Sequence, residues 1–369
     1  MKTLNKEENS QLKIKEIPTP GYERVIEATD SKSSLHCLIA IHDTTLGPSL
    51  GGARIYPYKQ KEDAIEDVLR LSKGMTYKSA LVENGFGGGK SVIIADPKKD
   101  KTEQLLETFG QVINSLKGQY IVAEDVGSSV EDMLVIRRQT PYVAALPTEK
   151  SSGDPSRFTA WGVFRGMQAM AMKLWKSPSL RNRRIAIQGL GHVGSRLADL
   201  LFWEGAKLTF SDVDIEKITR MAKEYGADIV LPDDFLAYPC DILSPCALGG
   251  ILNKQTIPYL KCQAIAGSAN NQLLERGDGR RIKDRGILYA PDFVINAGGI
   301  INAAAEFDND GYNPCRSRDR VNKIYDTLLE IFVHSEVEDK TPNRCAIDIA
   351  KQKIMHRIGK RNQPIEFQE

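Results

Sequence analysis

The sequence has few cysteines and histidines, and neither kind of residue is clustered. Six cysteines are scattered over 369 residues without a CxxC pair, and the five histidines add no grouped ligands. A protein metal site needs several such side chains at short spacing, so we expect no metal centre. The cysteines are therefore expected to be reduced and mostly buried thiols: Cys37, Cys240, Cys246, Cys262, Cys315 and Cys345.

Long apolar runs and an excess of one charge are also missing. No stretch of about 18 apolar residues occurs, and the N-terminal residues lack the apolar core of a signal peptide. Lysine plus arginine (50) nearly balance aspartate plus glutamate (48), which leaves a net charge of +2. This balance gives no reason to expect nucleic acid or an anionic membrane as a partner. We expect a cytoplasmic protein that acts on small molecules.

The length of the chain and its apolar periodicity favour two domains of the α/β class. Apolar runs at residues 35–41, 91–95 and 120–123 predict strands, and helical spacing occurs between and after them. A polar segment, PTEKSSGDPS at 147–156, then interrupts the pattern. We therefore expect a mixed α/β first domain over residues 1–146.

Beyond that segment, short apolar strands alternate with helical stretches. Such alternation is typical of a parallel, doubly wound (Rossmann-type) sheet, which we predict for residues 147–340. The last part of the chain, 341–369, is expected to pack back on the first domain.

A glycine motif marks a dinucleotide site in the second domain. GLGHVG (Gly189, Gly191, His192, Val193, Gly194) directly follows the predicted strand RIAIQ and precedes a helical run. Glycines there permit a tight turn and close approach of the backbone to a pyrophosphate, and the helix N-terminus offers free N–H groups. Asp212 ends the next strand, where a carboxylate accepts hydrogen bonds from ribose hydroxyls and repels a 2′-phosphate. NAD is therefore favoured over NADP. Asp214 could share this role, and a turn cluster with a helix-capping aspartate is the alternative.

Two lysines flank a glycine-rich segment in the first domain. Lys78 and Lys90 lie in the segment KGMTYKSALVENGFGGGK (73–90). We interpret its three glycines, 87–89, as a turn, and we expect a strand to follow Lys90. The spacing and the strand that follows Lys90 exclude a P-loop. If Lys90 is desolvated and lies beside the charge of Lys78, its pKa falls, and it can lose its proton near neutral pH and act as a base. The alternative is that both lysines are solvated surface charges.

Asp125 ends the strand in YIVAEDVGSS, a position where ligand sites of α/β proteins collect. It could move a proton to and from an amine. Glu124 competes for this role, and either carboxylate could instead cap the helix that follows.

Six segments together resemble a known family. LGPSLGGARI (46–55), KGMTYKSALVENGFGGGK (73–90), YIVAEDVG (120–127), CDILSPCALGG (240–250), IAGSANNQL (265–273) and YAPDFVINAGGIIN (289–302) are similar to the glutamate, leucine, phenylalanine and valine dehydrogenases. Within that family the leucine dehydrogenases are the most similar. The resemblance implies an NAD-dependent enzyme that deaminates an L-amino acid to a 2-oxo acid, ammonia and NADH, reversibly. It also implies a homo-oligomer.

The resemblance assigns roles to these residues. Lys78 would hold the substrate α-carboxylate, Lys90 would be the base that activates the attacking water, and Asp125 would relay protons to the nitrogen. Thr159, Asn270 and Asn296 would contact the cofactor, although Thr159 could be a helix cap and Asn296 a turn residue. The first domain would then bind substrate and carry the catalytic groups.

The resemblance also indicates the preferred side chain of the substrate. Leu50 stands where glutamate dehydrogenases carry a lysine for the distal carboxylate, so an acidic substrate should be rejected. A branched-chain amino acid such as leucine is expected. Phenylalanine or valine dehydrogenase activity, or a catalytically silent NAD-binding regulatory protein, is the alternative. The predicted substrate-binding residues, besides Lys78, are Leu50, Gly51, Gly52, Ala123, Asn271, Ile300 and Ala303.

Overall fold

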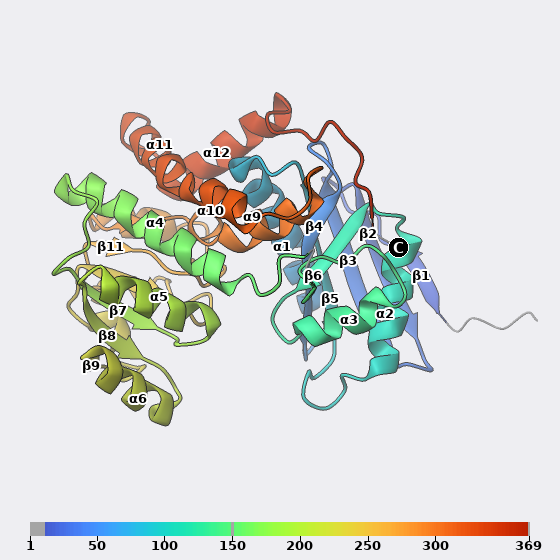
Figure 1. Cartoon of the computed structure of the whole chain (residues 1–369), viewed down its shortest axis with the longest axis horizontal. Coiled ribbons are helices and arrows are strands. Elements are labelled where there is room, and N and C mark those ends of the chain that lie inside the picture. The colour runs from blue at the N-terminus through green and yellow to red at the C-terminus, as the bar shows by residue number, and fades with distance from the viewer. Residues whose placement is uncertain (1–11, 149–150, 368–369) are drawn as a thin grey trace, which may run out of the picture. The chain divides into compact units, whose positions relative to one another are not determined.

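A computed structural model describes residues 12–148 and 151–367 of the chain. These residues form two compact units (Figure 1). Unit 1 comprises the residues up to Ser79, Gly85–Gly153 and those from Gly359 on, and unit 2 comprises Ala80–Asn84 and Asp154–Ile358. Both are α/β structures, which confirms the predicted fold class.

The C-terminal tail is divided differently from our prediction, which assigned all of 341–369 to the first domain. Helix α12 (Pro342–Met355) groups with unit 2, because it packs on helix α11 (Ile324–Val337) with Cys345, Ala346 and Ala350 buried. The residues from Gly359 on group with unit 1.

Unit 1 is built on a mixed sheet of six strands in the order β1-β2-β3-β5-β4-β6. The pairs β1–β2, β2–β3 and β3–β5 are antiparallel, whereas β4 runs parallel to both β5 and β6. The carboxyl ends of β4, β5 and β6 therefore meet at one edge of the sheet. The strands span Lys13–Glu16, Arg24–Asp30, Leu35–Asp43, Ser49–Tyr56, Gly87–Ile94 and Tyr120–Glu124, from β1 to β6.

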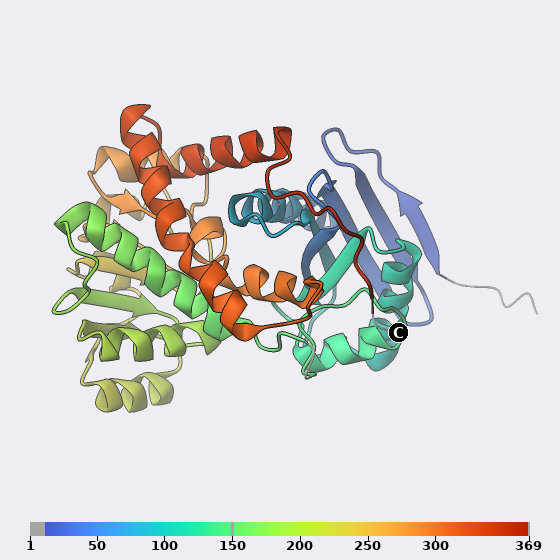
Figure 2. The ribbon, with the colours of Figure 1, turned by 45° about the horizontal axis from the view of Figure 1, so that its top comes forward.

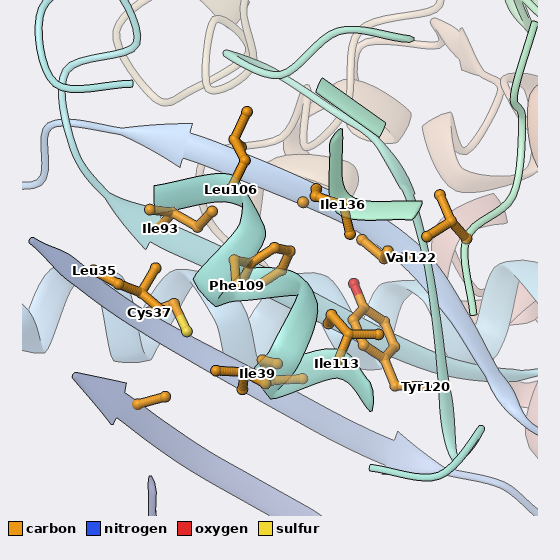
Figure 3. Packing of buried hydrophobic residues seen from close by; sticks show 14 of the residues in the cluster. Leu35, Cys37, Ile39, Ile93, Leu106, Phe109, Ile113, Tyr120, Val122 and Ile136 are labelled. Atoms are coloured by element: carbon orange, nitrogen blue, oxygen red, sulfur yellow. The ribbon is translucent and has the colours of Figure 1, made fainter. Parts of the chain in front are cut away.

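Helices cover both faces of this sheet. Strand side chains alternate between the faces. In β3, Cys37 and Ile39 pack with Phe109 of α2 (Glu103–Ser115), whereas Ile136 of α3 (Val130–Arg137) lies beside Val122 of β6, as Figure 3 shows. Leu38 and Ala40 point the other way and pack against α1 (Lys61–Val82). We call this side of the sheet, which α1 covers, the α1 face. The candidate catalytic residues lie on it.

The three glycines 87–89 do not form the turn that we predicted. They are the first residues of β5, which pairs with both β3 and β4. A Cβ atom on Gly88 would lie 2.1 Å from the backbone nitrogen of Thr76, and one on Gly87 would lie 2.2 Å from the carbonyl oxygen of Asp43. The glycines are therefore required by close backbone packing around a buried strand.

Unit 2 contains a six-stranded sheet in which every pair is parallel, in the order β12-β11-β10-β7-β8-β9. Counted from β7, this is the strand order of dinucleotide-binding folds, with the order reversing between β7 and β10. Ligands of such sheets bind outside the carboxyl ends of the strands at that reversal. The strands span Arg184–Gln188, Lys207–Ser211, Asp228–Ile229, Ile242–Pro245, Ala264–Ile265 and Leu288–Tyr289, from β7 to β12.

The helices of unit 2 pack against this sheet and against one another. Helix α4 (Ser156–Trp175) packs against both α5 (His192–Trp203) and α11 (Figure 2). Helices α10 and α11 follow one another closely, since α10 ends at Asn322 and α11 begins at Ile324. The other helices are α6 (Ile215–Tyr225), α7 (Asp278–Asp284), α8 (Asp292–Ile295), α9 (Gly298–Ala304) and α10 (Pro314–Asn322).

Most cysteine side chains are buried, as predicted. Cys37, Cys240, Cys262 and Cys345 are buried, Cys246 is partly buried and Cys315 is exposed. Across the described residues, no helix combines the length and apolar character needed to cross a membrane.

We expect Gly74→Ala to stabilise unit 1 by about 0.5–1 kcal/mol, because Gly74 lies inside α1 and alanine lowers the entropy of the unfolded chain. A Cβ atom at this position meets no atom within 4 Å. Denaturant unfolding measures the change. The matched variant Gly162→Ala in α4 should instead destabilise, since its Cβ would lie 2.9 Å from Ile324 Cδ1 and 3.1 Å from the Ile295 carbonyl oxygen. Equal effects of the two changes would contradict this account.

Candidate active site

Lys90 lies in the middle of β5, and its side chain is on the α1 face of the sheet. It pairs with Ala40 of β3, whose side chain packs on that face. Only 6% of the Lys90 side chain is exposed. The alternative of a solvated surface lysine is therefore wrong.

The Lys90 ammonium is paired with the carboxylate of Asp125. Lys90 Nζ lies 3.0 Å from Asp125 Oδ1, and the Asp125 side chain is 13% exposed. Burial lowers the pKa of Lys90 below its usual value against the attraction of Asp125, and the charge of Arg54 lowers it further. Burial alone would raise the pKa of Asp125, but the charges of Lys90 and Arg54 lower it to about 2. The sequence prediction that these two residues share a site is thus matched by direct contact.

Asp125 is fixed by the turn that follows β6. Its backbone N–H donates to Ser128 Oγ (2.9 Å), and the Ser128 hydroxyl donates to the Ala53 carbonyl oxygen of β4 (2.8 Å). The helix that follows is capped by Ser129, which forms a capping box with Asp132. The alternative in which Glu124 or Asp125 caps that helix is therefore wrong.

Arg54 is a member of this site that the sequence interpretation missed. Its Nε lies 3.0 Å from Asp125 Oδ2, and its Nη1 lies 2.7 Å from Asp67 Oδ2. Asp67 also accepts a hydrogen bond from the Tyr58 hydroxyl at 2.6 Å. We had expected Lys78 to be the neighbouring positive charge, and Arg54 is a cation that the structure places in direct contact with Asp125.

The other predicted residues of unit 1 lie around the same sheet. Register pairs Gly52 of β4 with Ala123 of β6, and Leu50 is two residues before Gly52 on the same face. Leu50 is fully buried. Gly51 is on the opposite face, where a Cβ atom would lie 1.9 Å from the Gly89 carbonyl oxygen, so Gly51 serves strand packing. Lys78 lies in the last part of α1 and is partly buried.

The glycine motif of unit 2 lies where the sheet order reverses. Gly189 follows β7 in a left-handed conformation (φ 89°), and a Cβ atom on it would lie 2.8 Å from Ala247 Cβ, just past β10. Gly191 precedes α5 without a side-chain cap, and a Cβ atom there would meet no atom within 4 Å. His192 is exposed and Val193 partly buried in the first turn of α5. Open space at an uncapped helix N-terminus fits a pyrophosphate.

Asp212, directly after β8, is turned toward this motif. Its Oδ2 accepts a hydrogen bond from the Leu190 N–H (2.6 Å), and its Oδ1 accepts one from the Asp214 N–H (3.0 Å). Asp214 is the N-cap of α6, where it accepts a hydrogen bond from the Lys217 N–H. Asp214 thus has a structural task of its own, whereas the carboxylate of Asp212 directly supports the glycine loop.

Asn296 and Asn270 are joined in unit 2. Asn296 Nδ2 donates to Asn270 Oδ1 (2.8 Å) and to the Ser268 carbonyl oxygen (3.0 Å). The Asn296 Oδ1 atom is buried and lacks a hydrogen-bond partner within the described parts of the chain. A buried acceptor without a donor is costly, so it fits a ligand N–H such as that of a carboxamide.

Thr159 lies close to the segment that follows Asn296. It is inside the first turn of α4 rather than at the N-cap, which is Pro155, so the helix-cap alternative is wrong. Its hydroxyl donates to the Pro155 carbonyl oxygen (3.1 Å), and a Cβ atom on Gly299 would lie 2.9 Å from Thr159 Oγ1.

The remaining predicted residues also belong to unit 2. Ile300 and Ala303 are buried and lie three residues apart on α9, which places them on one side of the helix. Asn271 has a left-handed backbone conformation (φ 53°), and its carbonyl oxygen accepts a hydrogen bond from the Gly250 N–H (2.7 Å). Lys90 and Asp125 lie in unit 1, whereas the residues predicted to contact the cofactor lie in unit 2.

Comparison with known proteins gives consistent matches over nearly the whole chain. Residues 23–142 match the family model described as Glu/Leu/Phe/Val dehydrogenase, dimerisation domain. Residues 152–347 match the model described as Glutamate/Leucine/Phenylalanine/Valine dehydrogenase. Residues 143–151, between the two matches, are covered by neither model.

Relatives from several organisms show the same similarity. The chain is 47% identical to a leucine dehydrogenase of Geobacillus stearothermophilus, over 95% of each chain. It is 43% identical to a phenylalanine dehydrogenase of Caldalkalibacillus thermarum, over 92% of each. Among solved structures, L-tryptophan dehydrogenase from Nostoc punctiforme is similar with a TM-score of 0.78 and 41% identity, covering 91% of this chain and 96% of that one.

Proposed function

The chain belongs to the Glu/Leu/Phe/Val dehydrogenase family, and we propose that it oxidatively deaminates a branched-chain L-amino acid, leucine first, using NAD. The products are the 2-oxo acid, ammonia and NADH, and the reaction is reversible. The observation that carries this proposal is the buried Lys90–Asp125 pair on the α1 face. It provides a base and a proton carrier in a desolvated setting.

Lys90 is the general base in this proposal. A protonated lysine cannot accept a proton, and burial together with the Arg54 charge lowers the Lys90 pKa, so its neutral form is reached at a lower pH. Neutral Lys90 removes a proton from the water that attacks the oxidised α-carbon. As an ammonium it then stabilises the negative charge that develops on the adduct.

Asp125 carries a proton to and from the substrate nitrogen in this proposal. While Lys90 is charged, two cations hold the carboxylate in its ionised form. When Lys90 becomes neutral, one of these cations is lost and the affinity of Asp125 for a proton rises. Proton transfer to the leaving amine is thus linked to the protonation state of Lys90.

The substrate is held by a charge at one end and by apolar contacts at the other. We assign its α-carboxylate to Lys78 and its side chain to Leu50 and Ala123, all three in unit 1. For Ile300 and Ala303 of unit 2, the substrate-binding role stays a prediction from the sequence. Leu50 is fully buried. Placing the distal carboxylate of glutamate against such residues without a partner costs several kcal/mol. Differences of one methylene change affinity by only about 1–3 kcal/mol, so related aliphatic substrates should be used less efficiently.

The residues of unit 2 fit NAD. Gly191 and the start of α5 would face the pyrophosphate, Asp212 the ribose, and Asn296 with Asn270 and Thr159 the nicotinamide end. When bound there, NAD supplies the hydride acceptor for the α-carbon of the substrate. The chain itself contributes the open glycine loop, the carboxylate that supports it and the unpaired Asn296 oxygen.

We expect Asp212→Arg to weaken NAD binding about 10- to 100-fold and to improve the use of NADP, because the change removes a charged acceptor and adds a phosphate partner. It also removes the acceptor of the Leu190 N–H. Dissociation constants for both cofactors, measured by fluorescence titration, check this. An unchanged preference would mean that Asp212 does not face the ribose. Asp233→Arg, an exposed aspartate of unit 2, is the control.

A substrate panel tests the proposed function. NADH formation is followed with leucine, isoleucine, valine, phenylalanine and glutamate, and kcat/KM is compared. Leucine should be used best and glutamate least. Phenylalanine or valine as best substrate would move the chain to another branch of the family, and glutamate would contradict the role of Leu50. No turnover with any of them would leave an NAD-binding protein without this activity.

We further propose that the protein acts in the cytoplasm as a homo-oligomer. The family model matched by unit 1 is described as a dimerisation domain, which supports assembly through that unit. Light scattering on the purified protein determines the number of subunits.

A further inference from the structure

The carboxylate of Asp125 is held from two sides by different cations. Lys90 Nζ contacts Oδ1 at 3.0 Å, and Arg54 Nε contacts Oδ2 at 3.0 Å. The side chain of Arg54 is 15% exposed, so both contacts are largely removed from water. Arg54 therefore fixes the oxygen that Lys90 does not contact, and with it the orientation of the whole carboxylate.

Arg54 is itself held by a second carboxylate. Its Nη1 contacts Asp67 Oδ2 of α1 at 2.7 Å, and the same oxygen accepts the Tyr58 hydroxyl at 2.6 Å. The Asp67 side chain is 12% exposed. A continuous chain of contacts thus runs through five residues drawn from β4, β5, α1 and the loops after β4 and β6: Tyr58, Asp67, Arg54, Asp125 and Lys90.

The net charge of these five contacting residues is zero only while Lys90 is protonated. Lys90 and Arg54 are then offset by Asp125 and Asp67. Without Arg54, Asp125 and Asp67 would still act on the lysine, and the guanidinium that contacts both carboxylates would be lost, so Lys90 would hold its proton more tightly. Desolvation makes this effect larger than it would be at the surface.

We propose that Arg54 is a positioning residue for the deamination reaction: it fixes Asp125 against Lys90 and keeps Lys90 able to release its proton, while Asp67 and Tyr58 hold Arg54 in place. The inference rests on the proposed function. Arg54 acts through the Lys90–Asp125 pair. Its loss should therefore change the pH at which Lys90 releases its proton more than it changes the affinity for the substrate.

The other charged and titratable groups near the pair are compatible with this role. Arg70 contacts Asp67 Oδ1 at 3.5 Å from the exposed side of α1. Tyr120 of β6 is fully buried and its hydroxyl contacts the Gly51 carbonyl oxygen, so its high pKa keeps it neutral. The groups acting most directly on the pair are therefore Arg54 and, behind it, Asp67.

The test compares Arg54→Gln, Asp67→Asn and Tyr58→Phe with wild type, using the complete protein. The first readout is the pH profile of kcat/KM for leucine. Arg54→Gln should lower kcat at neutral pH about 10- to 100-fold. It should also shift the pH at which kcat/KM rises upward by about one unit or more. Asp67→Asn and Tyr58→Phe should each lower kcat less, because they loosen Arg54 without removing it. Affinity for NAD should stay the same in all three.

A second readout is independent of turnover. The rate at which acetic anhydride modifies Lys90, located by peptide mass, is measured against pH, since only the neutral amine reacts. Arg54→Gln should shift this curve to higher pH. If the wild type shows a labelling curve but turns over no amino acid, the proposed function fails while this inference is still decided by the shift.

The control is Arg138→Gln, which removes an exposed arginine of unit 1 that pairs with Glu103 and Glu107. It should change neither curve. If Arg54→Gln does not fold, Tyr58→Phe decides the matter, because it removes a single hydroxyl. Labelling curves that stay at the wild-type pH in every folded variant would overturn the proposal, even if kcat falls.

Discussion

Replacing Lys90 by alanine should lower kcat for leucine by a factor of about 100 to 10,000, the usual contribution of a positioned general base. NAD binding should persist, because the glycine motif, Asp212 and Asn296 all belong to unit 2. The change does not leave Asp125 as an unpaired buried charge, since Arg54 still contacts its other oxygen. The fold should therefore survive the loss of the ammonium group.

Steady-state rates and a fluorescence titration with NAD separate these two effects. Lys99→Ala is the matched control, because that lysine belongs to unit 1 and its side chain is 80% exposed. Its rate and NAD affinity should equal those of the wild type. If Lys90→Ala turned over leucine at the wild-type rate, Lys90 would have no part in the mechanism.

The change Gly52→Ala should lower kcat at least about 100-fold, although it adds only one methyl group. The new Cβ would lie 2.7 Å from both Asp125 Cβ and the Glu124 carbonyl oxygen, and 3.2 Å from Lys90 Nζ. Glu124 is the last residue of β6 and pairs with Ala53 of β4, and Asp125 follows it directly, so neither atom can move easily. Displacing catalytic groups by about 1 Å is enough for a loss of this size.

The comparison with Gly74→Ala shows whether the position or the residue type is responsible. Both glycines are in unit 1, but only the Cβ at residue 52 meets the pair, whereas that at residue 74 meets open space. Gly74→Ala should keep the wild-type kcat. A folded Gly52→Ala protein with normal kcat, as judged by an unchanged melting profile, would show that the present geometry of Lys90 and Asp125 is not needed.

The sequence predicted the elements that have strong local patterns. The parallel sheet of unit 2 follows from short apolar strands between helices, and the glycine motif lies at the predicted strand–helix junction. Lys90 and Asp125 were proposed from residue type and family resemblance, and the structure shows them in contact.

Arg54, Asp67 and Tyr58 could not be found in this way, because their roles depend on strand register. The parallel pairing of β4 with β6 sets Gly52 opposite Ala123, and this brings Arg54, two residues on, to Asp125 although 71 positions separate them. No strand was predicted at β4, where glycines interrupt the apolar pattern. Had one been assigned, Arg54 would have been recognised on the same face as Gly52.

Register also explains the error about the three glycines. Consecutive glycines ordinarily indicate a turn. In β5 they allow the backbone of Thr76 and Asp43 and the side chain of Ser49 to approach a central strand, a requirement that is visible only once α1 and the neighbouring strands are in place. The same glycines place Lys90 in the buried middle of the sheet.

The most direct test of the central claim uses leucine deuterated at its α-carbon, incubated with the wild-type protein and NAD at alkaline pH. The account predicts reduced NAD that carries the deuterium, together with equal amounts of ammonia and the 2-oxo acid. Reduced NAD without deuterium, or no reduced NAD from leucine or any other amino acid of the panel, would contradict it.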